Sequence, residues 1–263
     1  MKKRLVAFLS FFQINLGTLH QNDTQLQCDC NLFDFATLIS ENVPEDLVSL
    51  LSGSKYPHTL LLSSSNFQMW KCEVNPVLML PVSQESFLLM PHEYFICKDH
   101  SLRCPDKCTC YRGANDTRRI LDCRNQSHTS LPTNIELSDS MSQLIVNLEH
   151  NNIVNLPECD DPQYKWLKNV STLNIQYNEI TPKTLPLFDR FLRCMKKITV
   201  LLLAYNNIQY LPPGIQHMNF AALSISGNKL SCCNTHWMKI WLQDKNETIR
   251  NSLTAHCIDR GDS

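Results

Sequence analysis

The sequence lacks both a large net charge and a long apolar run. Its 24 Lys and Arg residues nearly balance 25 Asp and Glu residues, which gives a formal net charge of −1. There is therefore no electrostatic basis for binding nucleic acid or an anionic membrane surface. Short basic pairs such as Arg118-Arg119 and Lys196-Lys197 are expected on solvated faces. No stretch approaches the roughly 20 apolar residues that a transmembrane helix needs, so we expect no membrane span in this chain.

Common enzyme motifs are absent as well. The chain contains neither H-E-x-x-H nor G-x-S-x-G, and its histidines are scattered. A cysteine nucleophile would need a lowered pKa and a base partner. Because the cysteines fall in clusters, disulfide bonds explain them better than catalysis does. We therefore expect a non-catalytic protein without a cofactor.

Cysteine is what the sequence has in abundance, with 13 residues among 263. Clustered cysteines predict disulfides and an oxidising, extracellular compartment. Since 13 is odd, at least one thiol has no partner within this chain. Five N-x-S/T sequons favour the same compartment and predict N-glycosylation at Asn22, Asn115, Asn125, Asn169 and Asn246.

The N-terminus has the pattern of a secretory signal peptide. Residues 1–17 begin with the basic run Met1–Arg4, and a short, largely apolar stretch follows. This stretch is too short to cross a bilayer. The alternative is that it is the remnant of a preceding repeat.

Residues 132–230 contain four copies of one unit, spaced by 22 to 28 residues. Each copy has apolar residues at positions 1, 4, 6 and 11, except that Gln143 begins the first copy. Position 9 is always asparagine: Asn151, Asn178, Asn206 and Asn228. Positions 4 and 6 would alternate inward on a short strand, and parallel stacking of the strands would pair their backbone groups. We therefore predict an α/β solenoid of leucine-rich repeats with parallel strands on its concave face, in which the asparagines satisfy buried backbone groups.

The outward strand positions would line that concave face, and we take them as the candidate binding face. They include two tyrosines, and exposed aromatic side chains are frequent anchors of protein interfaces. The alternative is an ordinary wetted surface. The candidates are Asn147, Glu149, Asn174, Gln176, Tyr177, Leu202 and Tyr205.

Cysteine clusters bracket the repeats, as expected for a solenoid whose exposed ends need caps. Residues 104–131 carry a C-x3-C-x-C-x12-C pattern that ends at Cys123. A zinc site with His100 or His128 is the chemical alternative, but the C-x-C spacing is too tight for an ordinary zinc knuckle. The preceding cluster in residues 22–100 has four cysteines, for which the sequence allows three pairings. In residues 231–263, Cys232-Cys233 precedes Cys257.

This order of clusters resembles the membrane-proximal ectodomain of arthropod Toll-type receptors. The resemblance divides the chain into a C-terminal flanking cap (22–100), an N-terminal flanking cap (104–131), four repeats (132–230) and a second C-terminal cap, cut short (231–263). It implies the disulfides Cys28–Cys72, Cys30–Cys97, Cys104–Cys110, Cys108–Cys123 and Cys232–Cys257, with Cys233 left over. Cys159 and Cys194 lie in the longer connections between repeats, where we expect them to form a further pair; two free buried thiols are the alternative.

The resemblance also implies a function. Such a chain would be the extracellular, protein-binding part of an innate-immunity and developmental receptor, or a secreted form of it. Its partner would be a Spätzle-type cystine-knot cytokine or a second receptor chain. The alternative is a secreted leucine-rich-repeat protein for adhesion or ligand capture, similar to Slit-like proteins.

Overall fold

The computed structural model of the 263-residue chain describes residues 25–27, 29–30, 33, 71–73, 75–78, 94–100, 103–114, 117–137, 141–158, 160–183, 185–231, 237 and 241. The predicted signal peptide (1–17) and nearly all of the predicted last cap (231–263) lie outside this part. The chain divides into two compact units, residues 1–97 and 98–263. Each unit is described by itself.

The first unit is held by a short parallel sheet and a disulfide. Strands β1 (Gln25–Gln27) and β2 (Lys71–Glu73) pair in parallel, and η1 (Pro76–Leu78) follows β2. Cys30 is bonded to Cys97, the pair that the resemblance implied. Cys28 and the side chain of Cys72 lie outside the described part. This disulfide joins segments that lie 67 residues apart in the sequence.

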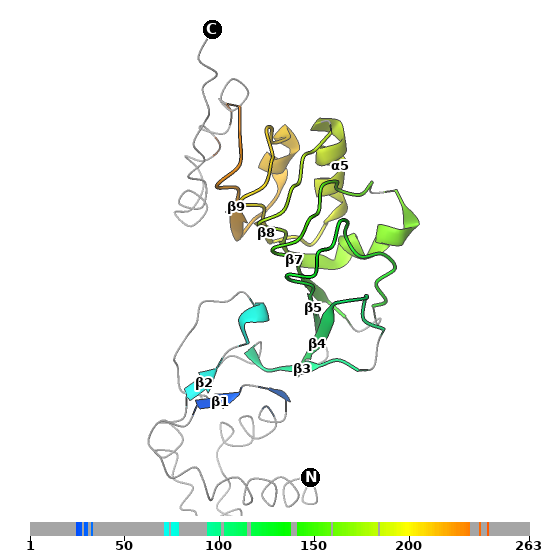
Figure 1. Cartoon of the computed structure of the whole chain (residues 1–263), viewed down its shortest axis with the longest axis vertical. Coiled ribbons are helices and arrows are strands. Elements are labelled where there is room, and N and C mark those ends of the chain that lie inside the picture. Colours follow the sequence, from blue (N-terminus) through cyan, green and yellow to red (C-terminus); the bar gives the residue numbers. More distant parts are fainter. Residues whose placement is uncertain are drawn as a thin grey trace, which may run out of the picture. The chain divides into compact units, whose positions relative to one another are not determined.

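The second unit is built on a sheet of short strands, which lie in successive coils of the chain (Figure 1). Its order is β3-β4-β5-β6-β7-β8-β9, which follows the sequence. Strands β4 and β5 form an antiparallel hairpin, and each strand from β5 to β9 pairs in parallel with the next. The strands are β3 (Ile96–Lys98), β4 (Thr109–Gly113), β5 (Arg118–Asp122), β6 (Gln143–Asn147), β7 (Val170–Asn174), β8 (Val200–Leu202) and β9 (Ala222–Ser224). The predicted leucine-rich-repeat solenoid is confirmed.

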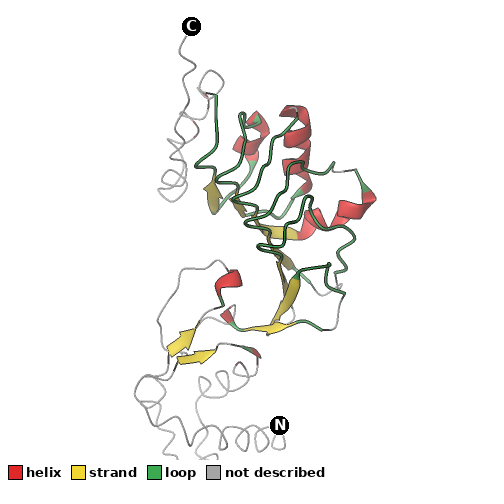
Figure 2. Ribbon diagram, in the orientation of Figure 1, coloured by secondary structure: helices red, strands yellow, loops and turns green. Residues whose placement is uncertain are grey.

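The returning segments of the coils are helical or irregular and lie on the side away from the strands (Figure 2). They contain η4 (Pro162–Asn169), α5 (Leu185–Cys194) and η5 (Pro213–His217). Helix α5 was not predicted, although its signal is in the sequence. Phe188, Phe191 and Leu192 recur at helical spacing and are at most 1% exposed. These three side chains pack in the core behind the strands, where a shorter repeat would have only a loop.

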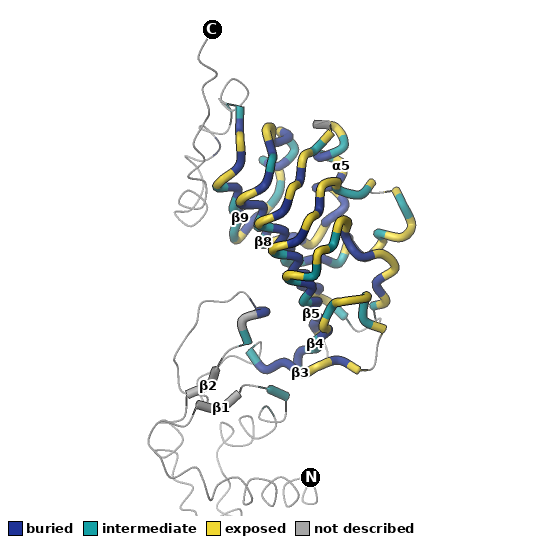
Figure 3. The backbone as a smooth tube through the Cα atoms, in the orientation of Figure 1, coloured by how far each residue is buried: buried dark blue, intermediate teal, exposed yellow. Residues whose placement is uncertain are grey.

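The core is the interior of the coil, where the inward strand positions gather (Figure 3). Position 4 aligns across the sheet, with Leu121 opposite Val146, and the same register continues through the later strands. All position-4 and position-6 residues of the four repeats are at most 1% exposed: Val146, Leu148, Leu173, Ile175, Leu201, Leu203, Leu223 and Ile225. Cys123 stands at position 6 of the coil that precedes them, so the predicted cap continues the register of the repeats.

The asparagines at position 9 tie each coil to the one before it. The Asn206 Oδ1 accepts a hydrogen bond from the Ile180 N–H at 3.0 Å, and its Nδ2 donates to the carbonyls of Ile175 and Leu203 at 2.9 and 3.1 Å. Asn178 and Asn228 repeat this set on their own coils. We call this row of side chains the asparagine ladder. It satisfies backbone groups that the turn off each strand would otherwise leave buried and unpaired.

The ladder extends into the cap. The Asn151 Oδ1 accepts from the backbone N–H groups of Gln126 and His128, and its Nδ2 donates to the carbonyls of Cys123 and Leu148. Asn151 thus links the first repeat to the disulfide-bonded coil before it.

One basic pair differs from its prediction. Arg118 and Arg119 are buried, at 9% and 0% exposure, rather than solvated. Arg119 donates to the carbonyls of Glu136 and Arg103, and its Nε lies 3.7 Å from Asp99 Oδ2. Burial lowers the pKa of Arg119, while Asp99 and Glu136 act in the opposite direction. A charge count along the sequence could not reveal these partners, which the fold brings together.

Replacement of Asn151 by Ala tests the ladder. The variant should lose about 2–4 kcal/mol of unfolding free energy, because several buried backbone groups lose their partner. The measurement is denaturant unfolding with the disulfides intact. Asn152→Ala, at the exposed neighbouring position, is the matched control and should change stability little. Equal effects of the two substitutions would contradict the ladder's role.

Candidate functional site

A row of stacked aromatic rings runs across the repeats at position 8. His150 and Tyr177 stack with ring centroids 4.3 Å apart and planes 11° apart, and Tyr177 and Tyr205 stack at 4.5 Å and 7°. We call these three residues the aromatic column. Its spacing follows from the distance of about 4.8 Å between neighbouring strands.

The backbone sets the column as much as the side chains do. His150, Tyr177 and Tyr205 have left-handed φ values of 55°, 53° and 54°. The N–H of each donates to the position-7 carbonyl of the following coil, at 3.1, 3.0 and 2.8 Å. The same turn therefore recurs once per coil and aims successive side chains in one direction.

Gly227 ends the column. It occupies position 8 of the last repeat and has a φ of 69°. A Cβ built on Gly227 would lie 2.5 Å from Cδ1 of Tyr205, so that ring packs directly against the glycine backbone. A larger residue there would push Tyr205 out of the stack.

The two tyrosines of the column are large hydrophobic side chains that are exposed to solvent. Tyr177 is 40% exposed and Tyr205 is 51% exposed. Partial loss of solvation, and next the neighbouring Tyr205, raise the pKa of the Tyr177 phenol. A tyrosine phenol, whose ordinary pKa is about 10, is neutral at physiological pH and can donate a hydrogen bond. The column offers rigid rings with polar tips, an arrangement suited to contact with another protein.

The other predicted members of the binding face divide into two groups. Glu149, Gln176 and Leu202 are half-buried beside the column. Asn147 and Asn174 are each 1% exposed, so the expectation that they face a ligand is wrong. Their Oδ1 atoms accept hydrogen bonds from the backbone N–H groups of Glu149 and Gln176, which draws these short side chains against the chain. His150 was missed, although the recurrence of position 8 could have identified it.

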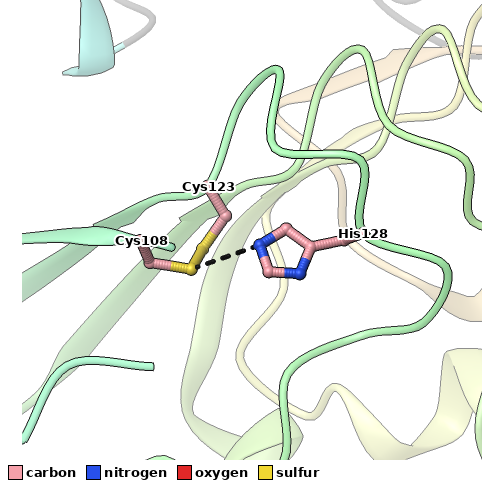
Figure 4. A group of neighbouring side chains, drawn as sticks. All are labelled: Cys108, Cys123 and His128. Atoms are coloured by element: carbon pink, nitrogen blue, oxygen red, sulfur yellow. Dashed lines mark hydrogen bonds between the residues drawn. A yellow bond between two sulfur atoms is a disulfide. The ribbon is translucent and has the colours of Figure 1, made fainter. Parts of the chain in front are cut away.

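Cys108, Cys123 and His128 are the group to consider for a metal ion (Figure 4). Their ligand atoms lie within 4.8 Å of one another, and the His128 Nε2 is 3.7 Å from the Cys108 Sγ. The two sulfurs, however, are joined in a disulfide, and Cys104 is likewise bonded to Cys110. Disulfide sulfur is not a thiolate ligand. The arrangement is therefore that of a stapled cap, with the two pairs that the resemblance implied.

The remaining predicted sites are described only in part. Cys194 is disulfide-bonded, but Cys159, its expected partner, lies outside the described residues, as do Cys232 and Cys257. Among the sequons, Asn125 is exposed and Asn169 is half-buried. Asn22, Asn115 and Asn246 lie outside the described part.

Comparison with known proteins gives one sequence relative and a common fold. No family model matches the chain. Over 254 residues, 93% of this chain, it is 23% identical to Protein toll of Drosophila melanogaster. The similarity thus extends over nearly the whole length of the present chain. It spans about a fifth of Toll, 21% of that protein's length.

Solved structures of Toll have the same fold. Two structures of the Drosophila Toll–Spatzle complex, one of them a glycosylated form, each superpose with a TM-score of 0.58 at 22% and 21% identity. Each match covers 90% of this chain and 28% of the Toll chain. The likeness to these structures and the described disulfides confirm the predicted solenoid with cysteine caps. None of the helices that the structure describes is long and apolar enough to span a membrane.

The lowered pKa of His128 predicts that the stability of the folded chain depends on pH. Burial, and next the charge of Lys107, lower the pKa of His128 below its ordinary value. The unfolded chain then takes up a proton at higher pH than the folded chain. The contribution of neutral His128 to the free energy of unfolding is thus complete above about pH 6.5. It declines as the pH falls toward the lowered pKa of the folded state. The melting temperature of His128→Leu should fall less between about pH 7 and pH 5 than that of the unsubstituted chain.

The control for this prediction is His217→Gln, which changes an exposed histidine of η5. It should leave the pH profile unchanged. A profile for His128→Leu as steep as that of the parent chain would refute the assignment.

Proposed function

We propose that this chain is a non-catalytic, extracellular protein-binding segment of a Toll-like receptor, and that the aromatic column is its contact surface. The exposed stack of His150, Tyr177 and Tyr205 carries this proposal. Tyrosine supplies a large contact area at a low entropic cost because few side-chain torsions must be fixed on binding. Stacking and a recurring backbone turn hold these rings in place before any partner arrives, which reduces that cost further.

The similarity to Toll supports a proposal for the class of partner. Toll has been solved in complex with Spatzle, and this chain is similar to about a fifth of Toll. A Spätzle-type cystine-knot cytokine or a second receptor chain is therefore the partner we propose. The near-neutral net charge favours a contact made by packing and hydrogen bonds over one driven by charge.

Binding by single-site variants tests the proposal. Tyr177→Ala and Tyr205→Ala should each weaken binding of the full secreted chain at least about tenfold, the loss expected for anchor residues. The measurement is surface plasmon resonance against a Spätzle-type cytokine and against a second copy of the chain. Tyr210→Ala is the matched control, because Tyr210 is 39% exposed but lies outside the column.

The outcomes separate the candidate functions. Binding that survives both column substitutions would remove the column from the contact. Binding to matrix components alone, with neither cytokine nor receptor chain bound, would favour the secreted adhesion protein instead.

A further inference from the structure

The aromatic column has a continuation on the cap side that holds no ring. The coil of residues 118–128 is in register with the first repeat, since Arg118 pairs with Gln143 and Asp122 with Asn147. Position 8 of that coil is Asn125. Its φ of 54° matches the 53–55° of the three ring residues. Its N–H donates to the Glu149 carbonyl at 3.1 Å, the bond that each ring residue makes to the next coil.

Asn125 is also the acceptor of a sequon, Asn125-Gln-Ser127, and both Asn125 and Ser127 are exposed. The other sequon that the structure describes, at Asn169, differs from it in exposure and in position. Asn169 is half-buried and ends η4, on the returning side of the coil. Of the two, only Asn125 stands at position 8, in line with the column.

We propose that Asn125 carries an N-linked glycan whose first N-acetylglucosamine packs on the face of His150 that Tyr177 leaves uncovered, as the fourth member of the column. Tyr177 stacks on one face of His150, and the other face looks toward the coil that holds Asn125. The asparagine carboxamide is short and spans only the base of a neighbouring ring. A sugar on its Nδ2 extends the side chain by one saturated ring, at the spacing of about 4.8 Å that the strands impose.

The chemistry of the contact suits the two surfaces. The C–H face of a pyranose carries partial positive charge, and the face of an aromatic ring is negative. The side chain of His150 is 51% exposed, so a sugar there would remove apolar surface from water. Glu149, whose Oε1 lies 3.8 Å from the His150 Nε2, stands beside the ring as a hydrogen-bond acceptor for sugar hydroxyl or acetamido groups.

The modification itself is the ordinary transfer from a lipid-linked oligosaccharide. The Nδ2 of Asn125 attacks C1 of the reducing-end N-acetylglucosamine, which is the sugar bonded to the lipid pyrophosphate, and passes one proton to a base of the transferase. The C1–O bond to the lipid pyrophosphate breaks, and the lipid pyrophosphate leaves with the bonding pair. No oxidant or reductant is needed.

The first test is occupancy and coupling in the full chain secreted from a eukaryotic host. Glycopeptide mass spectrometry should find Asn125 modified. Asn125→Gln should lower the melting temperature by about 2–4 °C in the parent chain. In a His150→Ala background the same substitution should have little effect, because its stacking partner is already gone. With His150→Phe, which keeps a ring, the loss should return. Asn169→Gln is the matched control and should change stability equally in all three backgrounds.

A second test needs no substitution and so avoids variants that fail to fold. An endoglycosidase that leaves one N-acetylglucosamine on a high-mannose form should preserve the melting temperature, because the first sugar makes the contact. Complete removal by an amidase, which leaves an aspartate at the acceptor position, should lower it. An unmodified Asn125, or a cost of Asn125→Gln that is the same with and without the His150 ring, would overturn the proposal.

Discussion

An asparagine side chain that bridges successive coils is the contact on which the solenoid depends. Each coil must turn off its strand, and the turn leaves backbone N–H and carbonyl groups inside the protein. The asparagine at position 9 accepts from one coil and donates to two, as Asn206 does toward Ile180, Ile175 and Leu203. A leucine or alanine there could fill space but could not supply this pairing. The repeat of Asn at one offset is thus a requirement of the backbone.

The ladder also fixes where the proposed contact surface lies. Because consecutive coils are locked at the strand spacing, whatever residue follows the strand by a constant offset forms a row. At position 8 that row is His150, Tyr177 and Tyr205, bounded by Asn125 and Gly227. The rings need no scaffold of their own, since the turn that holds them belongs to the repeat. The similarity to Toll is compatible with this arrangement, and the column gives the shared fold a specific surface in this chain.

Much of this architecture could be read from the sequence because it is local and repeated. The inward apolar residues and the asparagine keep the same positions within each repeat, and the cap cysteines fall in clusters. Within the described residues, the structure contains them in the expected places. What the sequence analysis missed depends on hydrogen bonds and packing that the repeat pattern does not encode. The burial of Arg119 needs Asp99 and Glu136 as neighbours. Asn147 and Asn174 have the alternation of exposed strand residues, but bonds to the backbone bury them. Helix α5 lies in the connection between β7 and β8, whose structure the repeat pattern does not specify.

Hydrogen–deuterium exchange resolved at single amides tests the central claim most directly. The N–H groups of Ile153, Ile180 and Ile208 are held by asparagine side chains rather than by neighbouring strands. If the ladder locks the coils together, these three amides should exchange only with global unfolding, as slowly as the central strand amides. Exchange at the rate of exposed loop amides would show that the asparagines do not hold the coils, and would contradict the account.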